Sequence, residues 1–198
     1  MRLADEMPHN SISVVSRPDR EPIMIITIEP IETRHSAYIQ EVASDPELAK
    51  TSDIPHPLPP EGASAWIERM KALREQGKAL TFAIMADGSA VGGCQLGNLD
   101  RTDSNSGELG FFVGRPFWGR GYATEGSRLL LAHAFCELRL TSVRAACLAW
   151  NAAAVRVLKK LGFELSHDGP PPRGSKFPET ERFQYWILTS KAWESALK

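Results

Sequence analysis

The most constraining feature of this chain is a glycine-rich turn between an apolar run and an amphipathic segment. The run covers Leu109 to Val113, the turn lies within RPFWGRGYATEG at 115–126, and the amphipathic segment extends from Tyr122 to Leu138. A strand, a tight turn and a helix start leave the first helix amides without internal partners, and the macrodipole adds about half a positive charge there. Because Gly119 and Gly121 lack a Cβ atom, a bulky anion can approach their backbone. The sequence therefore predicts a phosphate or pyrophosphate site.

Two familiar nucleotide-binding turns do not match this segment. The P-loop string Gly-x-x-x-x-Gly-Lys-Ser/Thr does not occur in the chain. The dinucleotide fingerprint Gly-x-Gly-x-x-Gly fits Gly119 and Gly121, but Thr124 stands at its third glycine position. A tight turn without a ligand stays the alternative if only the glycines are considered, whereas the charge of Arg120 favours an anion.

A second strand and helix are expected downstream. Residues 142–148 have the pattern of a strand, Asn151 can cap a helix, and Gly162 suits the position just after a helix. Apolar residues recur between them at helical spacing: Ala154, Leu158 and Leu161.

These two segments, in this order, resemble the GNAT superfamily of acyl-CoA-dependent N-acetyltransferases. In that family a Gln/Arg-x-x-Gly-x-Gly/Ala turn holds the coenzyme A pyrophosphate, and a later Asn-x-x-Ala…Gly-Phe helix flanks the pantetheine arm. Here the turn reads Trp118-Gly-Arg-Gly121-Tyr-Ala123, with Trp in the Gln/Arg position. The string WGRGYATE is most similar to the branch containing the ribosomal-protein N-terminal acetyltransferases. The resemblance covers about residues 22–195 and is strongest over 107–163.

The resemblance implies that acetyl-CoA is a co-substrate and that no metal takes part. Phe112 and Val113 would bind pantetheine through main-chain groups, and Asn151 would contact it, with a plain helix N-cap as the alternative. Glu108 opens the fourth strand, where some relatives place a general base, and its alternative is an exposed strand-end carboxylate. The turn itself supplies the other expected coenzyme-binding residues: Trp118, Gly119, Arg120, Gly121, Tyr122, Ala123 and Thr124.

Two segments cannot join a sheet or a helix because of their Pro and Gly content, namely 53–60 and 168–178. Long irregular loops in a compact domain are often functional, and in GNAT relatives the corresponding regions flank the acceptor. We therefore predict that both loops form the walls of an amine pocket. His56 and Arg173 are its expected substrate-binding residues.

The resemblance implies transfer of an acetyl group from acetyl-CoA to a primary amine, by direct attack in a ternary complex. The acceptor could be a protein N-terminus or a small-molecule amine. Some relatives have a tyrosine as general acid where this chain has Leu158, and some have a serine where it has Ala154. These two departures leave a non-catalytic acyl-CoA-binding sensor as the alternative function.

Length and composition favour one soluble domain. The chain has 198 residues and a formal net charge of −1, which gives no reason to expect a nucleic acid or an anionic membrane as a partner. The expected location is cytoplasmic, and a homodimer stays open. Cys94, Cys136 and Cys147 lack the spacing of a zinc site and are expected to be buried, reduced thiols.

The order of elements predicts an α/β fold of the acyl-CoA N-acyltransferase kind, with a mixed, mostly antiparallel sheet flanked by helices. Residues 1–21 are expected to be a flexible extension and 22–198 the acetyltransferase domain. One helix, Pro60 to Glu75, is expected to bury Ala65, Trp66, Met70 and Leu73. The other expected elements are strands over 23–28, 80–86, 90–96, 109–113, 142–148 and 183–188, and helices over 31–42, 122–138 and 151–161.

Overall fold

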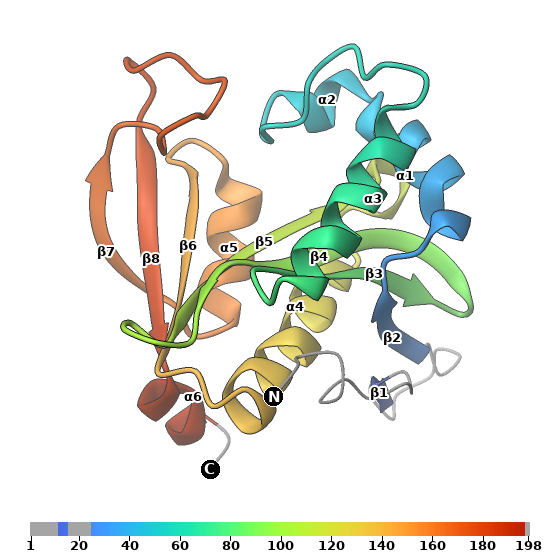
Figure 1. The fold of residues 1–198 in the computed structure, drawn as a ribbon. Coiled ribbons are helices and arrows are strands. Elements are labelled where there is room, and N and C mark those ends of the chain that lie inside the picture. Colours follow the sequence, from blue (N-terminus) through green and yellow to red (C-terminus); the bar gives the residue numbers. More distant parts are fainter. Residues whose placement is uncertain (1–11, 16–24, 197–198) are drawn as a thin grey trace.

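Eight strands form a single sheet in the order β1-β2-β3-β4-β5-β6-β8-β7 (Figure 1). The structure is a computed structural model that describes residues 12–15 and 25–196. Within these residues β5 and β6 are the one parallel pair, and all other neighbouring strands are antiparallel. The predicted α/β fold with a mixed, mostly antiparallel sheet is therefore confirmed.

The strands and helices alternate along the chain. The strands are β1 (Ile12–Val15), β2 (Ile25–Pro30), β3 (Leu80–Ala86), β4 (Ser89–Asp100), β5 (Ser106–Val113), β6 (Ser142–Leu148), β7 (Glu164–Gly169) and β8 (Phe183–Thr189). The helices are η2 (Thr33–His35), α1 (Ser36–Ala43), α2 (Pro46–Ala49), α3 (Gly62–Glu75), η3 (Arg115–Phe117), α4 (Tyr122–Ala132), η4 (His133–Glu137), α5 (Ala152–Lys160) and α6 (Ser190–Ala196).

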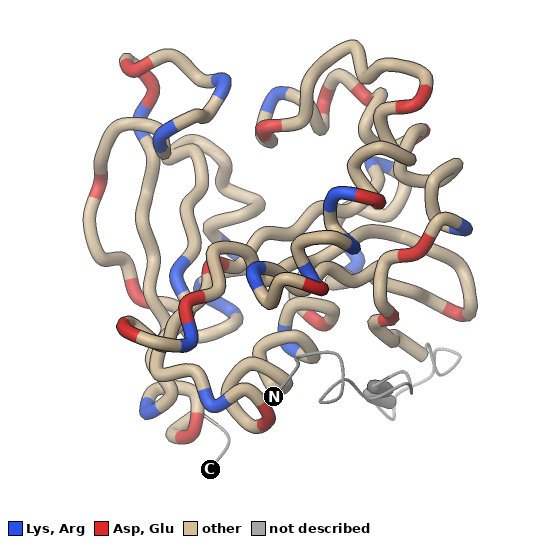
Figure 2. The backbone as a smooth tube through the Cα atoms, in the orientation of Figure 1, with Lys and Arg blue, Asp and Glu red and all other residues tan. Residues whose placement is uncertain are grey.

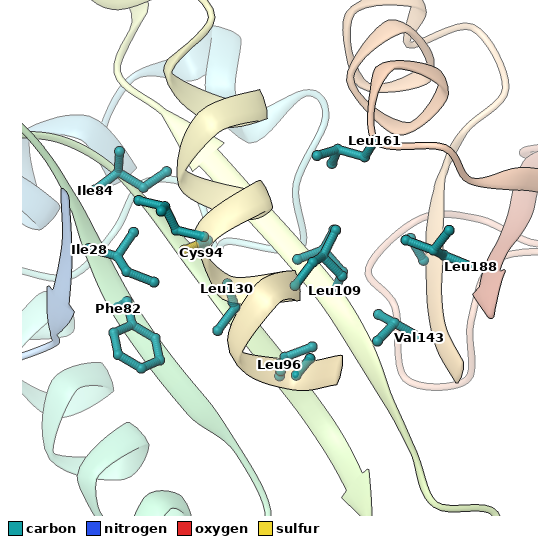
Figure 3. Close-up of a cluster of buried hydrophobic side chains, with 14 of the residues drawn as sticks. Ile28, Phe82, Ile84, Cys94, Leu96, Leu109, Leu130, Val143, Leu161 and Leu188 are labelled. Atoms are coloured by element: carbon teal, nitrogen blue, oxygen red, sulfur yellow. The ribbon is translucent and has the colours of Figure 1, made fainter. Parts of the chain in front are cut away.

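The middle of the sheet is covered on both faces, and β3 shows how its side chains divide. Successive side chains of a strand point to opposite faces. Phe82 and Ile84 join the large core cluster that includes α4, whereas Ala83 and Met85 pack in a second cluster with α1 and α3. Figure 3 shows Ile84 and other sheet residues lying against the α4 side chain Leu130. Helix α4 therefore lies on one face of the sheet and α3 on the other.

Helix α3 is rotated from the orientation that the sequence predicted. Ala65 is exposed, whereas Ala63 and Ile67 are buried, and Met70 is buried as expected. The helix begins at Gly62, and the residues at positions 63, 67 and 70 fall on one helical stripe facing the sheet. Trp66 and Leu73 flank this stripe and pack against it partly buried.

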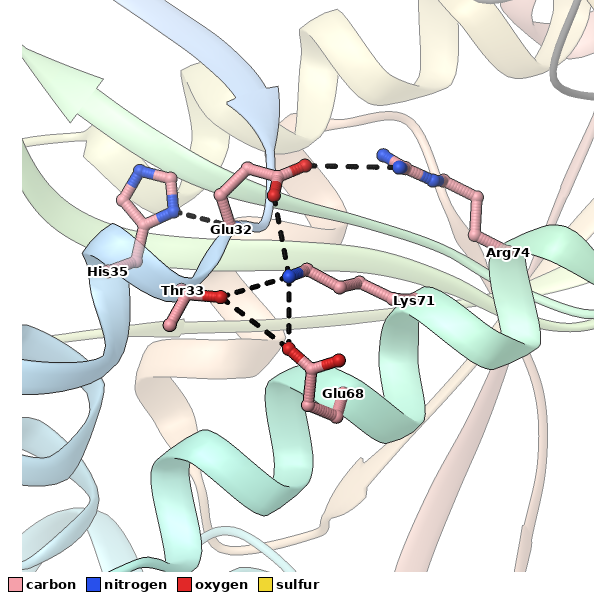
Figure 4. A network of polar contacts seen from close by, with 6 residues as sticks. All are labelled: Glu32, Thr33, His35, Glu68, Lys71 and Arg74. Atoms are coloured by element: carbon pink, nitrogen blue, oxygen red, sulfur yellow. Dashed lines mark hydrogen bonds and ion pairs between the residues drawn. The ribbon is translucent and has the colours of Figure 1, made fainter.

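A charged network joins α3 to η2 (Figure 4). The Lys71 ammonium donates to Thr33 Oγ1 at 2.9 Å and to Glu68 Oε1 at 3.0 Å. It also lies 3.6 Å from Glu32 Oε2, and Arg74 approaches the same carboxylate at 3.8 Å. The hydrogen bond to Glu68 raises the pKa of Lys71. These contacts hold η2 and α3 together on one face of the sheet.

Strands β5 and β6 separate after a short paired segment. Their register pairs are Ser106 with Ser142, Gly107 with Val143, and Glu108 with Arg144. Beyond this point β5 continues along β4 to Val113, while β6 continues along β8 to Leu148. Figure 1 shows the two strands diverging from their common start. The sheet thus opens into two halves immediately after Glu108.

The structure differs from the sequence predictions for one cysteine and one loop, and it describes only part of a third predicted segment. Cys136 is exposed, not buried, whereas Cys94 and Cys147 are buried free cysteines as expected. Residues 164–169 form β7, so the irregular loop predicted over 168–178 begins two residues later. Within the expected extension 1–21, the strand β1 pairs with β2, and the rest of that segment lies outside the described residues.

Candidate functional site

The turn between β5 and α4 has a backbone conformation that suits its glycines. Gly119 has φ +77° and Gly121 has φ +87°, a left-handed conformation that glycine adopts without steric cost. A Cβ atom built at either position would have no atom within 4 Å, so the space beside the turn is open. Gly121 is the N-cap of α4 and provides no side-chain cap. Within the described residues, the backbone N–H groups of Gly119, Arg120 and Ala123 have no protein acceptor.

Aromatic packing fixes the residues around this turn. Trp118 Nε1 donates to the Val113 carbonyl at 2.7 Å, and its indole is 48 % exposed. Phe117 packs edge-on against Tyr122 with ring centroids 6.2 Å apart, and the Arg120 guanidinium lies 5.9 Å from the Phe117 centroid. Tyr122 is itself buried. The turn is therefore rigid on the protein side and presents amides and one arginine to solvent.

Thr124 and Ala123 follow in the first turn of α4. Thr124 is buried, and Ala123 packs partly buried against the large core cluster. Their side chains thus belong to the core, and what they offer to an anion at the turn is their main chain.

Asn151 is the N-cap of α5, which is the alternative that we gave to a contact with pantetheine. Its Oδ1 accepts a hydrogen bond from the Ala154 amide at 3.1 Å, and its Nδ2 has no protein acceptor within the described residues. The predicted helix stop is also confirmed. Gly162 has φ +87°, its N–H donates to Lys159 O at 3.1 Å, and the Phe163 N–H donates to Leu158 O at 3.0 Å.

Glu108 lies where the strands part and beside an open space. Its register partner on β4 is Gly97, and the next β5 residue on the same face is Gly110. Neither glycine has a side chain, and a Cβ atom at Gly110 would meet nothing within 4 Å. Asn98 Nδ2 donates to Glu108 Oε2 at 2.9 Å. Glu108 therefore borders open space at Gly110, whereas the Gln95 side-chain amide lies 3.2 Å from where a Cβ atom at Gly97 would be.

Tyr185 of β8 borders the same region from the other half of the sheet. Burial raises the pKa of its phenol, and the negative charge of nearby Glu108 raises it further. The Tyr185 hydroxyl donates to the Pro170 carbonyl at 2.7 Å, and its ring stacks on His167 with centroids 4.6 Å apart. Sequence reasoning missed both Tyr185 and Asn98, because the β4 bulge brings Asn98 to Glu108 and the order of strands places Tyr185 on β8, one strand beyond β6.

The two predicted acceptor loops are joined by hydrogen bonds, which we call the loop bridge (Asp53, Ser175 and Lys176). Asp53 Oδ1 accepts from Ser175 Oγ at 2.7 Å and from the Lys176 N–H at 3.0 Å. Lys176 Nζ donates to the carbonyls of Ala49 and Ile54, each at 2.7 Å. Figure 2 shows charges of both signs along these loops. Segments distant in the sequence thus meet above the two halves of the sheet.

His56 and Arg173 lie in these loops and are both exposed. The family's tyrosine position is taken by Leu158, which is buried in the core. Among the described residues no group of three or more His, Cys, Asp or Glu could hold a metal ion. No helix among them is both long and apolar enough to span a bilayer.

Comparison with known proteins identifies the family. Residues 26–164 match the family model described as "Acetyltransferase (GNAT) domain". The chain therefore belongs to the GNAT acetyltransferase family, as its two motifs indicated.

Individual relatives agree with this assignment. The L-amino acid N-acetyltransferase AaaT of Escherichia coli K12 is 30 % identical over 146 residues, which are 73 % of this chain and 86 % of the relative. The N-acetyltransferase p20 of Bacillus licheniformis is 26 % identical over 141 residues, 70 % of this chain and 79 % of that protein.

Solved structures share the fold. Mycobacterium smegmatis RimJ, solved with a CoA-disulfide, has a TM-score of 0.74 at 20 % identity, covering 87 % of this chain and 89 % of RimJ. Spermidine N-acetyltransferase from Vibrio cholerae, solved with CoA and spermine, has a TM-score of 0.73 at 14 % identity, covering 85 % and 98 %.

Proposed function

We propose that this protein transfers an acetyl group from acetyl-CoA to a primary amine by direct attack in a ternary complex. The observation that carries the proposal is the open space over Gly110, beside Glu108 and next to the point where β5 and β6 part. The same strand leads directly from Glu108 to the amide-rich turn at the start of α4. One continuous segment thus links a candidate base to a candidate phosphate site.

The residues present fit coenzyme A. The open space over Gly119 and Gly121, their unpartnered amides and the nearby Arg120 suit a pyrophosphate. The edge of β5 that has parted from β6 offers the main-chain N–H of Val113 for the pantetheine arm, since the Val113 carbonyl already accepts from Trp118 Nε1. Asn151 Nδ2 faces the arm from the other half of the sheet in this proposal. The proposed coenzyme-binding set is Phe112, Val113, Trp118, Gly119, Arg120, Gly121, Tyr122, Ala123, Thr124 and Asn151.

Glu108 has the role of general base in this proposal. An amine must be neutral to attack, and free amines have pKa values of about 7.7 to 10.4. Glu108 accepts the proton that the amine nitrogen loses, directly or through a water molecule, as the N–C bond forms and the C–S bond breaks. A main-chain amide of β5 stabilises charge on the thioester oxygen. Solvent protonates the departing thiolate, because the family's tyrosine position holds the buried Leu158.

The acceptor enters between the loops 53–60 and 168–178 in this proposal. The loop bridge and the position of Tyr185 beside Glu108 support an acceptor route on this side. His56 and Arg173 are the polar groups proposed to contact the amine substrate. We further propose that the enzyme is cytoplasmic; its near-zero charge gives no reason to expect a nucleic acid or an anionic membrane as a partner.

An acceptor screen that follows free thiol release tests the function. The screen offers acetyl-CoA with amino acids, polyamines and N-terminal peptides, and calorimetry measures acetyl-CoA binding in parallel. We expect binding and thiol release with at least one amine class. Binding without thiol release for every amine would favour the acyl-CoA sensor, and absence of binding would refute both functions.

A further inference from the structure

A bulge in β4 aims one side chain at Glu108. The register between β4 and β5 shifts between Gly97 and Asp100, and Asn98 in this bulge has φ +46°. This left-handed conformation is uncommon for residues other than glycine, although Asn and Asp tolerate it best. A bulge characteristically redirects a side chain at the edge of a pairing region. Here it brings Asn98 Nδ2 to 2.9 Å from Glu108 Oε2.

The chemistry of this contact is unambiguous. An ionised carboxylate can only accept hydrogen bonds, so the amide must present its NH₂ group to Glu108. A donor to the charged form stabilises that form relative to the neutral acid. The contact occupies Oε2 only, and Oε1 has no donor within the described residues. Asn98 thus orients Glu108 and leaves one oxygen available to accept a proton.

The contact is not needed to hold the adjacent loop. Backbone pairs close the bulge on both sides, between Gly97 and Glu108 and between Asp100 and Ser106. The Asp100 carboxylate accepts from the Thr102 and Ser104 amides at 3.0 Å each. These bonds organise the loop without the Asn98 side chain. The Asn98 amide is therefore free to serve the carboxylate.

We propose that Asn98 is a positioning residue for the acetyl transfer, because its amide holds one oxygen of the Glu108 carboxylate in place and leaves the other open. This inference rests on the proposed function, in which Glu108 is the general base. It adds a residue outside the motifs of the coenzyme site.

Two substitutions separate the side chain from the backbone conformation. Asn98→Gly deletes the donor, and Asn98→Asp replaces it with a carboxylate, while both residues accept φ +46°. We expect Asn98→Gly to lower kcat by about 3- to 10-fold, the value of one hydrogen bond, with the KM for acetyl-CoA unchanged. Asn98→Asp, which sets a second carboxylate against Glu108, should lower kcat at least as much.

A double-substitution cycle with Glu108→Gln tests whether Asn98 acts through Glu108. We expect Asn98→Gly to cause no further loss of turnover in the Glu108→Gln background, with melting temperatures confirming that each variant is folded. An equal loss in both backgrounds would overturn the positioning role while leaving the proposed function standing. Full turnover by Glu108→Gln alone would instead overturn the base assignment, and the positioning role with it.

Discussion

The coenzyme side of this protein and its acceptor side are built in different ways. The candidate coenzyme site comes from one continuous stretch, from the end of β5 through the glycine turn into α4. The candidate acceptor side combines the β4 bulge, β8 and two loops, and the loop bridge joins residues 123 positions apart. A site formed by local backbone geometry requires particular residues, such as glycine, at particular positions. A site assembled from distant loops can change its residues without disturbing the coenzyme side. The class of coenzyme can therefore be predicted from a motif in the sequence, whereas the acceptor cannot.

The point where the two sides meet should give the largest effect. We expect Glu108→Gln to lower turnover by about 10²-fold while leaving acetyl-CoA affinity nearly intact, because a base contributes to chemistry and not to coenzyme binding. Steady-state kinetics and calorimetry measure the two quantities. Glu164→Gln is the matched control, since Glu164 is an exposed carboxylate on the edge strand β7. It stands in the same cross-strand row as Glu108, because Glu164 pairs with Ile187, Ile187 with Arg144, and Arg144 with Glu108. Turnover within about threefold of the parent would leave Glu108 as a strand-end carboxylate.

A side chain added at the glycine turn should weaken coenzyme binding. We expect Gly121→Val to weaken acetyl-CoA binding by about tenfold or more, because a β-branched group would occupy the open approach and strain φ +87°. Calorimetry with acetyl-CoA measures the loss. Gly88→Val is the control, because Gly88 has a similar φ of +79° and equally open surroundings in the β3–β4 turn. Equal affinity in folded Gly121→Val would place the pyrophosphate elsewhere.

The open space over Gly110, beside Glu108, can be narrowed with one methyl group. We expect Gly110→Ala to lower kcat/KM for the amine by up to about tenfold, since an added methyl in a fitted pocket commonly costs this much. Gly110 is exposed and is not among the glycines with positive φ, so alanine should fold normally there. Acceptor kinetics at saturating acetyl-CoA provide the measurement. An unaffected reaction would show that neither substrate uses this space.

Opening the loop bridge should act on the acceptor side alone. Lys176→Met removes two hydrogen bonds to backbone carbonyls and should raise the KM for the amine by about threefold, with the KM for acetyl-CoA unchanged. Lys159→Met, at an exposed lysine of α5, is the control. If acetyl-CoA kinetics change instead, the loops serve the coenzyme and the division into two sides fails.

The smallest effects are expected from the two exposed loop residues. His56→Ala and Arg173→Ala should each change the KM for the amine by about two- to threefold, as expected for an exposed polar contact, and that for acetyl-CoA less. A larger effect in one variant than in the other would show which loop contacts the acceptor. Untouched acceptor kinetics in both variants would move the amine pocket away from these loops.

The elements that the sequence predicted well are those whose signals are local. The tight glycine turn at 119–121 and the Gly162 helix stop both have a backbone that only glycine adopts easily, with positive φ at all three glycines. Such signals depend on which side chains tolerate a given φ, so they can be seen without knowing the fold.

The elements that the sequence did not predict lack a local signal. Five of the six β7 residues are exposed, so this edge strand has no alternation of apolar and polar residues. The prediction for α3 placed Ala65 in the core, whereas Ala63 is the buried alanine. The two residues are identical in type, so only their position relative to the sheet distinguishes them. Hydrophobic periodicity alone does not fix the rotation of a helix by a single position.

The sequence by itself determined the family and the strand-turn-helix segment, because the motifs depend on glycine conformation and helix ends. Only the tertiary structure brought Asn98 to Glu108, placed Tyr185 within reach of the Glu108 charge and joined Asp53 to Lys176. Strand register and loop contacts arise from packing between segments far apart in the chain, and a one-residue change of register reverses which face a side chain occupies. The residues around Glu108 are therefore set by the assembled sheet, not by any single motif.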